Sequence, residues 1–282
     1  MTVLIGMFMV MGSIIGGFLI EHGNLATLLN PPELLIIFGA ASGSLVVGSP
    51  MKVVKAVIAS FASILKEGGA TKAEYLEMLA LLFIVFSKVR KEGLISIEQD
   101  VEEPGKSPMF TKYKSVISNH HAMRFICDNL KVIITTNMPP HELADLLDID
   151  IEASAHEEML PVMAIQKMGD ALPGFGIVAA VLGVVLTMEK ISEPPAVLGH
   201  SIGAALVGTF LGILLCYGFV GPIAQNLEIK VKEGEIMFYV IKTALVAFVG
   251  GAAPQIAVEA GRRAIPGHDR PTFAELEAAV RK

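Results

Sequence analysis

Residues 169–222 decide the fold of this chain, and they read GDALPGFGIVAAVLGVVLTMEKISEPPAVLGHSIGAALVGTFLGILLCYGFVGP. Two apolar segments, Leu172–Met188 and Ile202–Val220, lie on either side of a short polar link and contain no Asp, Glu, Lys or Arg. Each is close to the ~20 residues that a helix needs to cross the apolar core of a bilayer. Because the link is short, the sequence predicts a membrane-spanning helical hairpin.

Small residues recur at helical spacing in this hairpin. On its second arm Ala204, Gly208 and Gly212 follow one another every fourth residue. Apolar side chains gain little by leaving lipid for one another, so helices in a membrane associate where small residues let their backbones approach. We therefore expect this stripe to pack against a neighbouring helix.

The N-terminal part predicts a second hairpin. Thr2–Ile20 is apolar and uncharged, and it lacks the basic start and small-residue cleavage site of a signal peptide. Leu34–Val47 is apolar as well, and Met51–Ala62 continues its helical pattern. The sequence thus predicts four transmembrane helices arranged as two hairpins.

The composition indicates a membrane protein with a sizeable water-exposed part. Charged residues make up 18% of the chain, against about 25% in soluble domains. The long insert between the hairpins reads as helices with apolar residues on more than one face, as in a bundle. The expected fold class is therefore all-α. We divide the chain into a first hairpin, a helical cytoplasmic domain, a second hairpin and a cytoplasmic helical tail, at residues 1–50, 51–169, 170–222 and 223–282.

The basic residues indicate the orientation. Residues 1–50 contain no Lys or Arg, and residues 171–222 contain only Lys190. By the positive-inside rule, the two regions that hold the other basic residues are cytoplasmic, together with both termini. We expect a multi-pass protein of the cell inner membrane. The net charge of −6 argues against a nucleic-acid partner.

The sequence contains no recognisable catalytic constellation. It has no Gly-rich phosphate loop, no Ser/His/Asp arrangement and no metal-ligand spacing, and its two cysteines lie far apart. We therefore expect no enzyme, no metal site and no cofactor. Ionisable groups within a membrane are rare and functional, and the four segments contain none. Either the chain conducts no protons, or a partner supplies the carboxylate.

Several long runs resemble one protein family. They are LPGFGIVAAVLGVV, LVGTFLGILLCYGFVGPIA, APQIAVEAGRR and RPTFAELE, with GSIIGGFLI and PPELLIIFGAASGSLVVG near the N-terminus. Over nearly its whole length the chain is similar to the MotA family, the A-type stator proteins of the bacterial flagellar motor. The wider superfamily includes TolQ and ExbB, which energise outer-membrane transport. Those proteins have three spans, so the four spans predicted here favour the stator family, and a TolQ/ExbB-like protein is the alternative interpretation.

The resemblance implies a function and partners. In the family, five copies of the MotA-type protein surround two copies of a MotB-type protein, whose single span carries an aspartate. Ion flow between the two proteins drives a rotation, and the cytoplasmic domain delivers torque to the rotor switch protein FliG of the C ring. The expected assembly is thus a homo-pentamer with a MotB-type partner in the lipid bilayer.

The resemblance also assigns roles to residues of the membrane segments. The ion pathway falls on Ala180, Thr209 and Thr187, and coupling of ion flow to movement falls on Pro173 and Pro222. Sodium-driven relatives carry Thr where this chain has Ala180, which removes an oxygen ligand, so we expect the ion to be a proton. The Thr209 hydroxyl either orients water or bonds back to a carbonyl of its own helix. The prolines either couple movement or only bend their helices.

Rotor contact in the family uses an Arg and a Glu of the cytoplasmic insert, which match Arg90 and Glu98. Either could also be an ordinary solvated charge. Further charged residues nearby could make the same contact with the rotor, so we expect no single one of these residues to be indispensable. These neighbours are Lys88, Lys91, Glu92 and Asp100.

Overall fold

The computed structural model describes residues 2–28, 30–64, 69–136 and 138–281. Within these ranges every regular element is a helix, which confirms the all-α class. The chain forms two compact units, Met1–Glu67 with Glu158–Ile229 and Gly68–Glu157 with Lys230–Lys282. We call them the membrane unit and the bundle unit. Both predicted hairpins thus belong to one unit, while most of the insert and most of the tail form the other.

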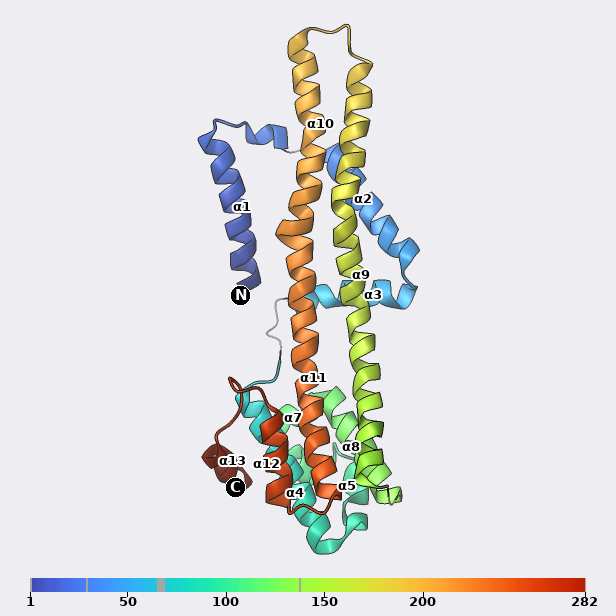
Figure 1. The fold of residues 1–282 in the computed structure, drawn as a ribbon, viewed down its shortest axis with the longest axis vertical. Coiled ribbons are helices and arrows are strands. Elements are labelled where there is room, and N and C mark those ends of the chain that lie inside the picture. The colour runs from blue at the N-terminus through green and yellow to red at the C-terminus, as the bar shows by residue number, and fades with distance from the viewer. Residues whose placement is uncertain (1, 29, 65–68, 137, 282) are drawn as a thin grey trace. The chain divides into compact units, whose positions relative to one another are not determined.

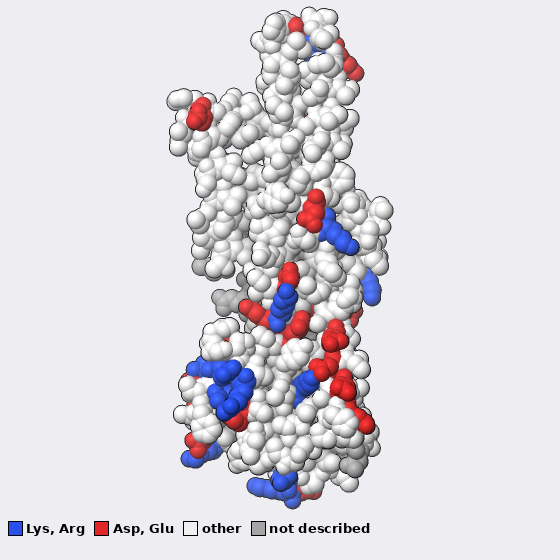
Figure 2. Space-filling view, viewed as in Figure 1, with Lys and Arg blue, Asp and Glu red and all other residues white. Residues whose placement is uncertain are grey.

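The membrane unit contains the stretches that can cross a bilayer. Among the described residues, four helical stretches are long and apolar enough to do so, which matches the predicted number. In Figure 2 charged side chains are sparse over the upper part of the view: some lie at its outermost loops, and an acidic and a basic group lie together about midway down. Its helices are α1 (Thr2–Ile20), η1 (Leu25–Leu28), α2 (Pro31–Gly48), α3 (Met51–Ser63), the second half of α9 (Pro140–Met188), α10 (Pro195–Leu215), η3 (Cys216–Val220) and the start of α11 (Gly221–Val249).

The second span does not continue into α3, contrary to the expectation from its pattern. Helix α2 ends at Gly48, and Ser49 is extended with φ −136° and ψ 140°. The cause is Pro50, because a residue that precedes proline is pushed out of the helical region. The apolar pattern therefore restarts in α3 as a separate helix.

The bundle unit is built around α4 (Lys72–Glu92). This helix is buried on more than one face, as the sequence predicted, and Leu82 and Phe86 have no exposed surface. It begins with a capping box between Thr71 and Glu74 and ends at Gly93, whose φ of +87° favours glycine. The other helices of the unit are η2 (Leu94–Ile97), α5 (Glu98–Glu102), α6 (Pro108–Thr111), α7 (Lys114–Ser118), α8 (His120–Thr135), α12 (Pro254–Ala264) and α13 (Phe273–Val280), besides the remaining parts of α9 and α11.

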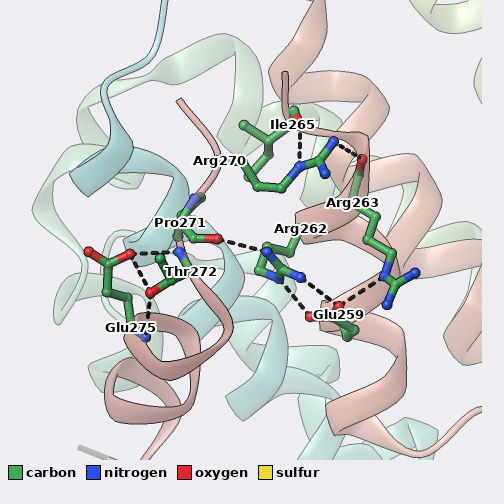
Figure 3. A network of polar contacts seen from close by, with 8 residues as sticks. All are labelled: Glu259, Arg262, Arg263, Ile265, Arg270, Pro271, Thr272 and Glu275. Carbon is green, nitrogen blue, oxygen red and sulfur yellow. Dashed lines mark hydrogen bonds and ion pairs between the residues drawn. The ribbon is translucent and has the colours of Figure 1, made fainter. Parts of the chain in front are cut away.

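A network of polar contacts fastens the C-terminal segment to α12 (Figure 3). Glu259 accepts hydrogen bonds from Arg262 at 2.7 Å and from Arg263 at 3.0 Å. Arg262 also donates to the carbonyl of Pro271 at 2.8 Å. The hydrogen bonds from Arg262, helped by Arg263 and opposed by burial, lower the pKa of Glu259 to about 2.

The last helix is held by a second capping box. Thr272 and Glu275 exchange hydrogen bonds at the start of α13, and Glu275 also pairs with Lys72 of α4 at 2.8 Å. The hydrogen bond from Lys72, followed by those from Thr272, lowers the pKa of Glu275 to about 2. The sequence runs APQIAVEAGRR and RPTFAELE are therefore structural: they close the bundle unit.

Candidate functional site

Glycines bring the two arms of the predicted hairpin, α9 and α10, into backbone contact. Figure 1 shows these helices side by side, joined by the link at residues 189–194. A Cβ atom at Gly212 would lie 2.6 Å from the carbonyl oxygen of Leu172 and 2.9 Å from the Cα atom of Gly176. One at Gly176 would lie 2.7 Å from the carbonyl oxygen of Gly208. Backbone cannot yield as a flexible side chain can, so only glycine fits at these positions.

The contact stripe on α10 differs by one residue from the one expected. Gly208 and Gly212 are buried, but Ala204 is only half-buried. Its neighbour Ala205 makes the next contact: a Cβ atom at Gly183 of α9 would lie 2.7 Å from the Cβ atom of Ala205. An α-helix has 3.6 residues per turn, so a stripe drawn at every fourth residue drifts off the contact line and a step of three restores it.

The predicted ion-pathway residues are only partly brought together. A Cβ atom at Gly208 would lie 3.2 Å from the backbone nitrogen of Ala180, so Ala180 and Thr209, the residue after Gly208, occupy the same level of the hairpin. Thr187 lies two turns along α9 from Ala180, buried, and donates its hydroxyl to Gly183 at 2.8 Å. Thr209 is half-buried, and its hydroxyl makes no hydrogen bond to any described residue. Of the two threonines, Thr187 bonds back to its own helix and Thr209 does not.

The two predicted coupling prolines lie inside long helices, and a π-helical turn precedes one of them. Pro173 lies within α9, and Pro222 is the second residue of α11. Residues Cys216–Val220 form the π-turn, and the N–H of Gly221 bonds five residues back to the carbonyl of Cys216. Proline donates no hydrogen bond and its ring crowds the preceding turn, so a local widening of the helix is the physical response. The proline predicted a bend, but not this wider turn.

The predicted rotor-contact residues are both exposed in the bundle unit. Arg90 lies in the last turn of α4 and Glu98 begins α5, and neither pairs with another described residue. Lys88, in contrast, pairs with Asp100 at 2.7 Å. Burial raises the pKa of Asp100, but hydrogen bonds from Lys88 and Ser107 outweigh it, so this pKa lies below its usual value. Lys88 and Asp100 are thus engaged, and the expected redundancy of charges is smaller than predicted.

One functional candidate was missed. Helix α2 begins two residues before Glu33, whereas the apolar segment drawn from the sequence began one residue after it. Glu33 is 5% exposed, and its Oε2 atom has no hydrogen-bond partner among the described residues. A Cβ atom at Gly208 would lie 3.0 Å from that oxygen. The inference that no span holds an ionisable group is therefore wrong. Proline at the first helical position, followed by an acid in the first turn, is the helix-start signal that could have shown this.

Comparison with known sequences identifies two matching family models. The Motility protein A N-terminal family matches residues 4–93, and the MotA/TolQ/ExbB proton channel family matches residues 117–238. The chain is 41% identical to Motility protein A of Escherichia coli over 100% of this chain and 95% of that protein. It is 36% identical to Chemotaxis protein LafT of Vibrio parahaemolyticus, covering 97% and 96% of the two chains.

Solved structures with the same fold belong to stator complexes. The structure of C. jejuni MotAB matches with a TM-score of 0.78 at 20% identity, over 96% of this chain and 98% of that chain. The flagellar MotAB stator complex from Bacillus subtilis matches with a TM-score of 0.75 at 23% identity, over 95% and 96%. These two likenesses establish the fold, and the closer sequence relatives establish the family. The chain belongs to the motility protein A family, within the MotA/TolQ/ExbB proton channel proteins.

Proposed function

We propose that this chain is the MotA-type stator protein of a flagellar motor. Together with a single-span MotB-type protein it forms a channel in the inner membrane and converts ion flow into torque on the rotor. The observation that carries this function is the full-length identity of 41% to a Motility protein A, joined to four helices that can span a membrane. The chain belongs to a channel family and is not an enzyme.

The packing of the hairpin supports a pathway between chains rather than within this one. The backbones of α9 and α10 touch at Gly176 and Gly212, so no passage for a hydrated ion runs between these two helices there. The pathway would then follow the outer face of the hairpin beside the half-buried Thr209, at the level of the buried Ala180, against a second protein. A MotB-type protein with an aspartate in its span fits that position, and five copies of this chain would enclose it.

The chemistry of the hairpin favours the proton as the transported ion. A partly dehydrated sodium ion needs several oxygen ligands at once, to replace its lost hydration shell. Ala180 offers no side-chain oxygen, and the hydroxyl of Thr187 is engaged with its own helix. Thr209 is left as a hydroxyl that can orient water. One hydroxyl and a carboxylate suffice for a proton path, but not for a sodium site.

We place both termini and the bundle unit in the cytoplasm, where the bundle meets FliG of the rotor. Arg90 and Glu98 are suited to this contact because they are exposed and unpaired among the described residues. Exposed ion pairs are worth only about 0–1 kcal/mol, so they can form and break as the rotor passes.

A deletion strain tests the function. Loss of this gene is expected to give paralysed cells that still carry complete flagella, and motility should return when the gene is supplied. The TolQ/ExbB alternative predicts sensitivity to detergent or failed siderophore uptake, with normal swimming. The second result would overturn the stator assignment.

A further inference from the structure

The carboxyl group of Glu33 is an unusual buried group in this chain. Only two buried side-chain oxygens lack a hydrogen-bond partner within the described ranges, Glu33 Oε2 and Asn226 Oδ1, and only the first belongs to an ionisable group. An isolated charged carboxylate is costly to bury in apolar surroundings, and taking up a proton removes that cost. An ionisable group inside a membrane marks a functional site by default.

Helix capping does not explain this side chain. A Glu at the third position of a helix commonly bonds back to the N–H of the N-cap residue. Two such glutamates of this chain, Glu74 and Glu275, do so at 2.6 Å. Glu33 occupies the same position in α2, but it makes no hydrogen bond to Asn30. Its carboxyl group lies against α10 instead of its own helix start.

The surroundings place this carboxyl beside the candidate ion pathway. The spot that a Cβ atom of Gly208 would occupy lies 3.0 Å from Glu33 Oε2, 3.1 Å from the Cβ atom of Ala179 and 3.2 Å from the backbone nitrogen of Ala180. Gly208 is the fourteenth residue of the 21 in α10, so the carboxyl lies beside the middle part of that helix. Thr209 is the next residue.

Other ionisable groups do not compensate Glu33. On α2 itself, Ile37 and Ala41 continue the buried face on which Glu33 lies. The arm of α9 between Leu172 and Met188 contains no titratable group. None of the other titratable groups on the elements packed against α2 or next to it pairs with Glu33: they are Lys167 and Asp170 of α9, His200 of α10, Cys216 and Tyr217 of η3, and Lys52 and Lys55 of α3.

We propose that Glu33 is a second proton-binding carboxyl of the channel, in addition to the aspartate of the MotB-type partner. A proton entering from the aqueous side forms an O–H bond at the carboxyl of Glu33. That bond breaks when the proton passes to water held near Thr209 and on toward the partner's carboxylate, which restores the ionised Glu33. Atoms and charge balance over each cycle. This inference rests on the proposed function, since it needs a proton-conducting complex.

Proton flux through the complete complex tests the proposal. This chain and its MotB-type partner are reconstituted together in lipid vesicles, a pH gradient is imposed, and the rate of proton entry is followed for each variant. Glu33→Gln keeps the size of the side chain but cannot release a proton, and we expect the flux to fall about tenfold or more. Glu33→Asp should retain part of it. Glu193→Gln, in the exposed link between α9 and α10, is the matched control and should conduct like the wild type.

A second measurement separates a proton carrier from a packing residue. The infrared difference spectrum of the wild-type complex between alkaline and acidic pH should contain the carbonyl band of protonated carboxylic acids, and Glu33→Gln should remove from that band the component that Glu33 contributes. Should Glu33→Gln fail to assemble on size-exclusion chromatography, the spectrum and flux of Glu33→Asp decide instead. Unchanged flux in Glu33→Gln, or an unchanged band, would overturn the proposal. A wild-type complex that carries no protons would instead refute the proposed function.

Discussion

The membrane unit and the bundle unit are held together by opposite means. In the membrane unit the closest helix contacts are between backbones at glycine, and α1 has no buried residue at all. In the bundle unit the contacts are between large side chains, as where Phe86 and Phe248 stack with ring centroids 4.3 Å apart. Water drives large apolar side chains together, whereas lipid does not. The bundle unit therefore relies mainly on large side chains, although a Cβ atom at Gly261 would lie 3.0 Å from the carbonyl oxygen of Val240, whereas the contact of α9 with α10 relies on glycine.

The two units also treat their carboxylates differently. In the bundle unit Asp100, Glu259 and Glu275 are each paired with a basic side chain, and the pKa of each is lowered. In the membrane unit the buried Glu33 has no partner among the described residues. Pairing stabilises the folded bundle. A carboxyl that is left unpaired stays free to exchange a proton.

The largest effect should come from removing bulk in the bundle unit. Phe86→Ala deletes a fully buried ring, and such substitutions cost about 3–5 kcal/mol of unfolding free energy. Thermal unfolding of the purified protein in detergent, followed by circular dichroism, measures it. Ile95→Ala, at a side chain that is 77% exposed, is the control. If both variants melt alike, the stacked pair does not stabilise the unit.

Adding bulk should break the membrane unit. Gly212→Ala would place a methyl group 2.6 Å from the carbonyl oxygen of Leu172, and forced overpacking costs about 1–3 kcal/mol. We expect less intact complex on size-exclusion chromatography and weaker swimming, and Gly208→Leu should act in the same direction. Gly203→Ala, with no heavy atom within 4 Å of the new methyl group, should behave like the wild type. Equal recovery of the Gly212 and Gly203 variants would contradict the proposed backbone contact.

Acid should weaken the bundle unit through Glu259. Its folded pKa of about 2 lies below the ordinary value of 4.5, so its contribution is complete above pH 4.5 and is lost as the pH falls toward 2. This contribution is on the order of 1–3 kcal/mol of unfolding free energy. Melting temperatures measured from pH 7 to pH 3 should fall less steeply in Glu259→Gln, which starts from a lower value. Parallel curves for the two proteins would show that this pair contributes nothing.

Substitution of an exposed charged residue of the bundle unit should have the smallest effect on stability. Its effect should be confined to torque. Arg90→Glu should leave expression, assembly and proton flux intact while lowering single-motor torque, because it reverses a contact worth about 0–1 kcal/mol. Reversing the matching charge on FliG should restore part of it. Arg124→Glu, on an exposed face of α8, is the control. Loss of assembly in Arg90→Glu would make Arg90 a structural residue of the bundle.

Much of the fold could be predicted because apolar length and helix signals are local. Two uncharged apolar runs and a short link were enough to predict the hairpin. The apolar pattern and the break at Gly93 were enough to predict α4. The separation of α2 from α3 could also have been predicted, since Pro50 lies between them. We did not predict this break because the apolar residues after Pro50 follow the same helical period as those before it.

The details of the candidate site were less predictable because they depend on contacts between distant parts of the chain. Nothing near Glu33 in the sequence indicates that Gly208 lies against its carboxyl group. The pairing of Lys88 with Asp100 likewise joins two helices. Both residues were predicted to be alternative rotor-contact charges, and the structure shows them paired with each other. The shift from Ala204 to Ala205 follows from the drift of the helical period, which a stripe drawn at fixed spacing ignores.

Proton flux measured with and without the partner tests most directly whether the ion pathway lies between chains. This chain alone, and this chain with its MotB-type partner, are reconstituted in vesicles in sodium-free buffer under an imposed proton gradient. Because α9 and α10 are closed against each other, we predict no flux for the chain alone and a clear flux for the complex, unchanged when sodium is added. Proton entry through the chain alone, or flux that appears only with sodium, would contradict the account.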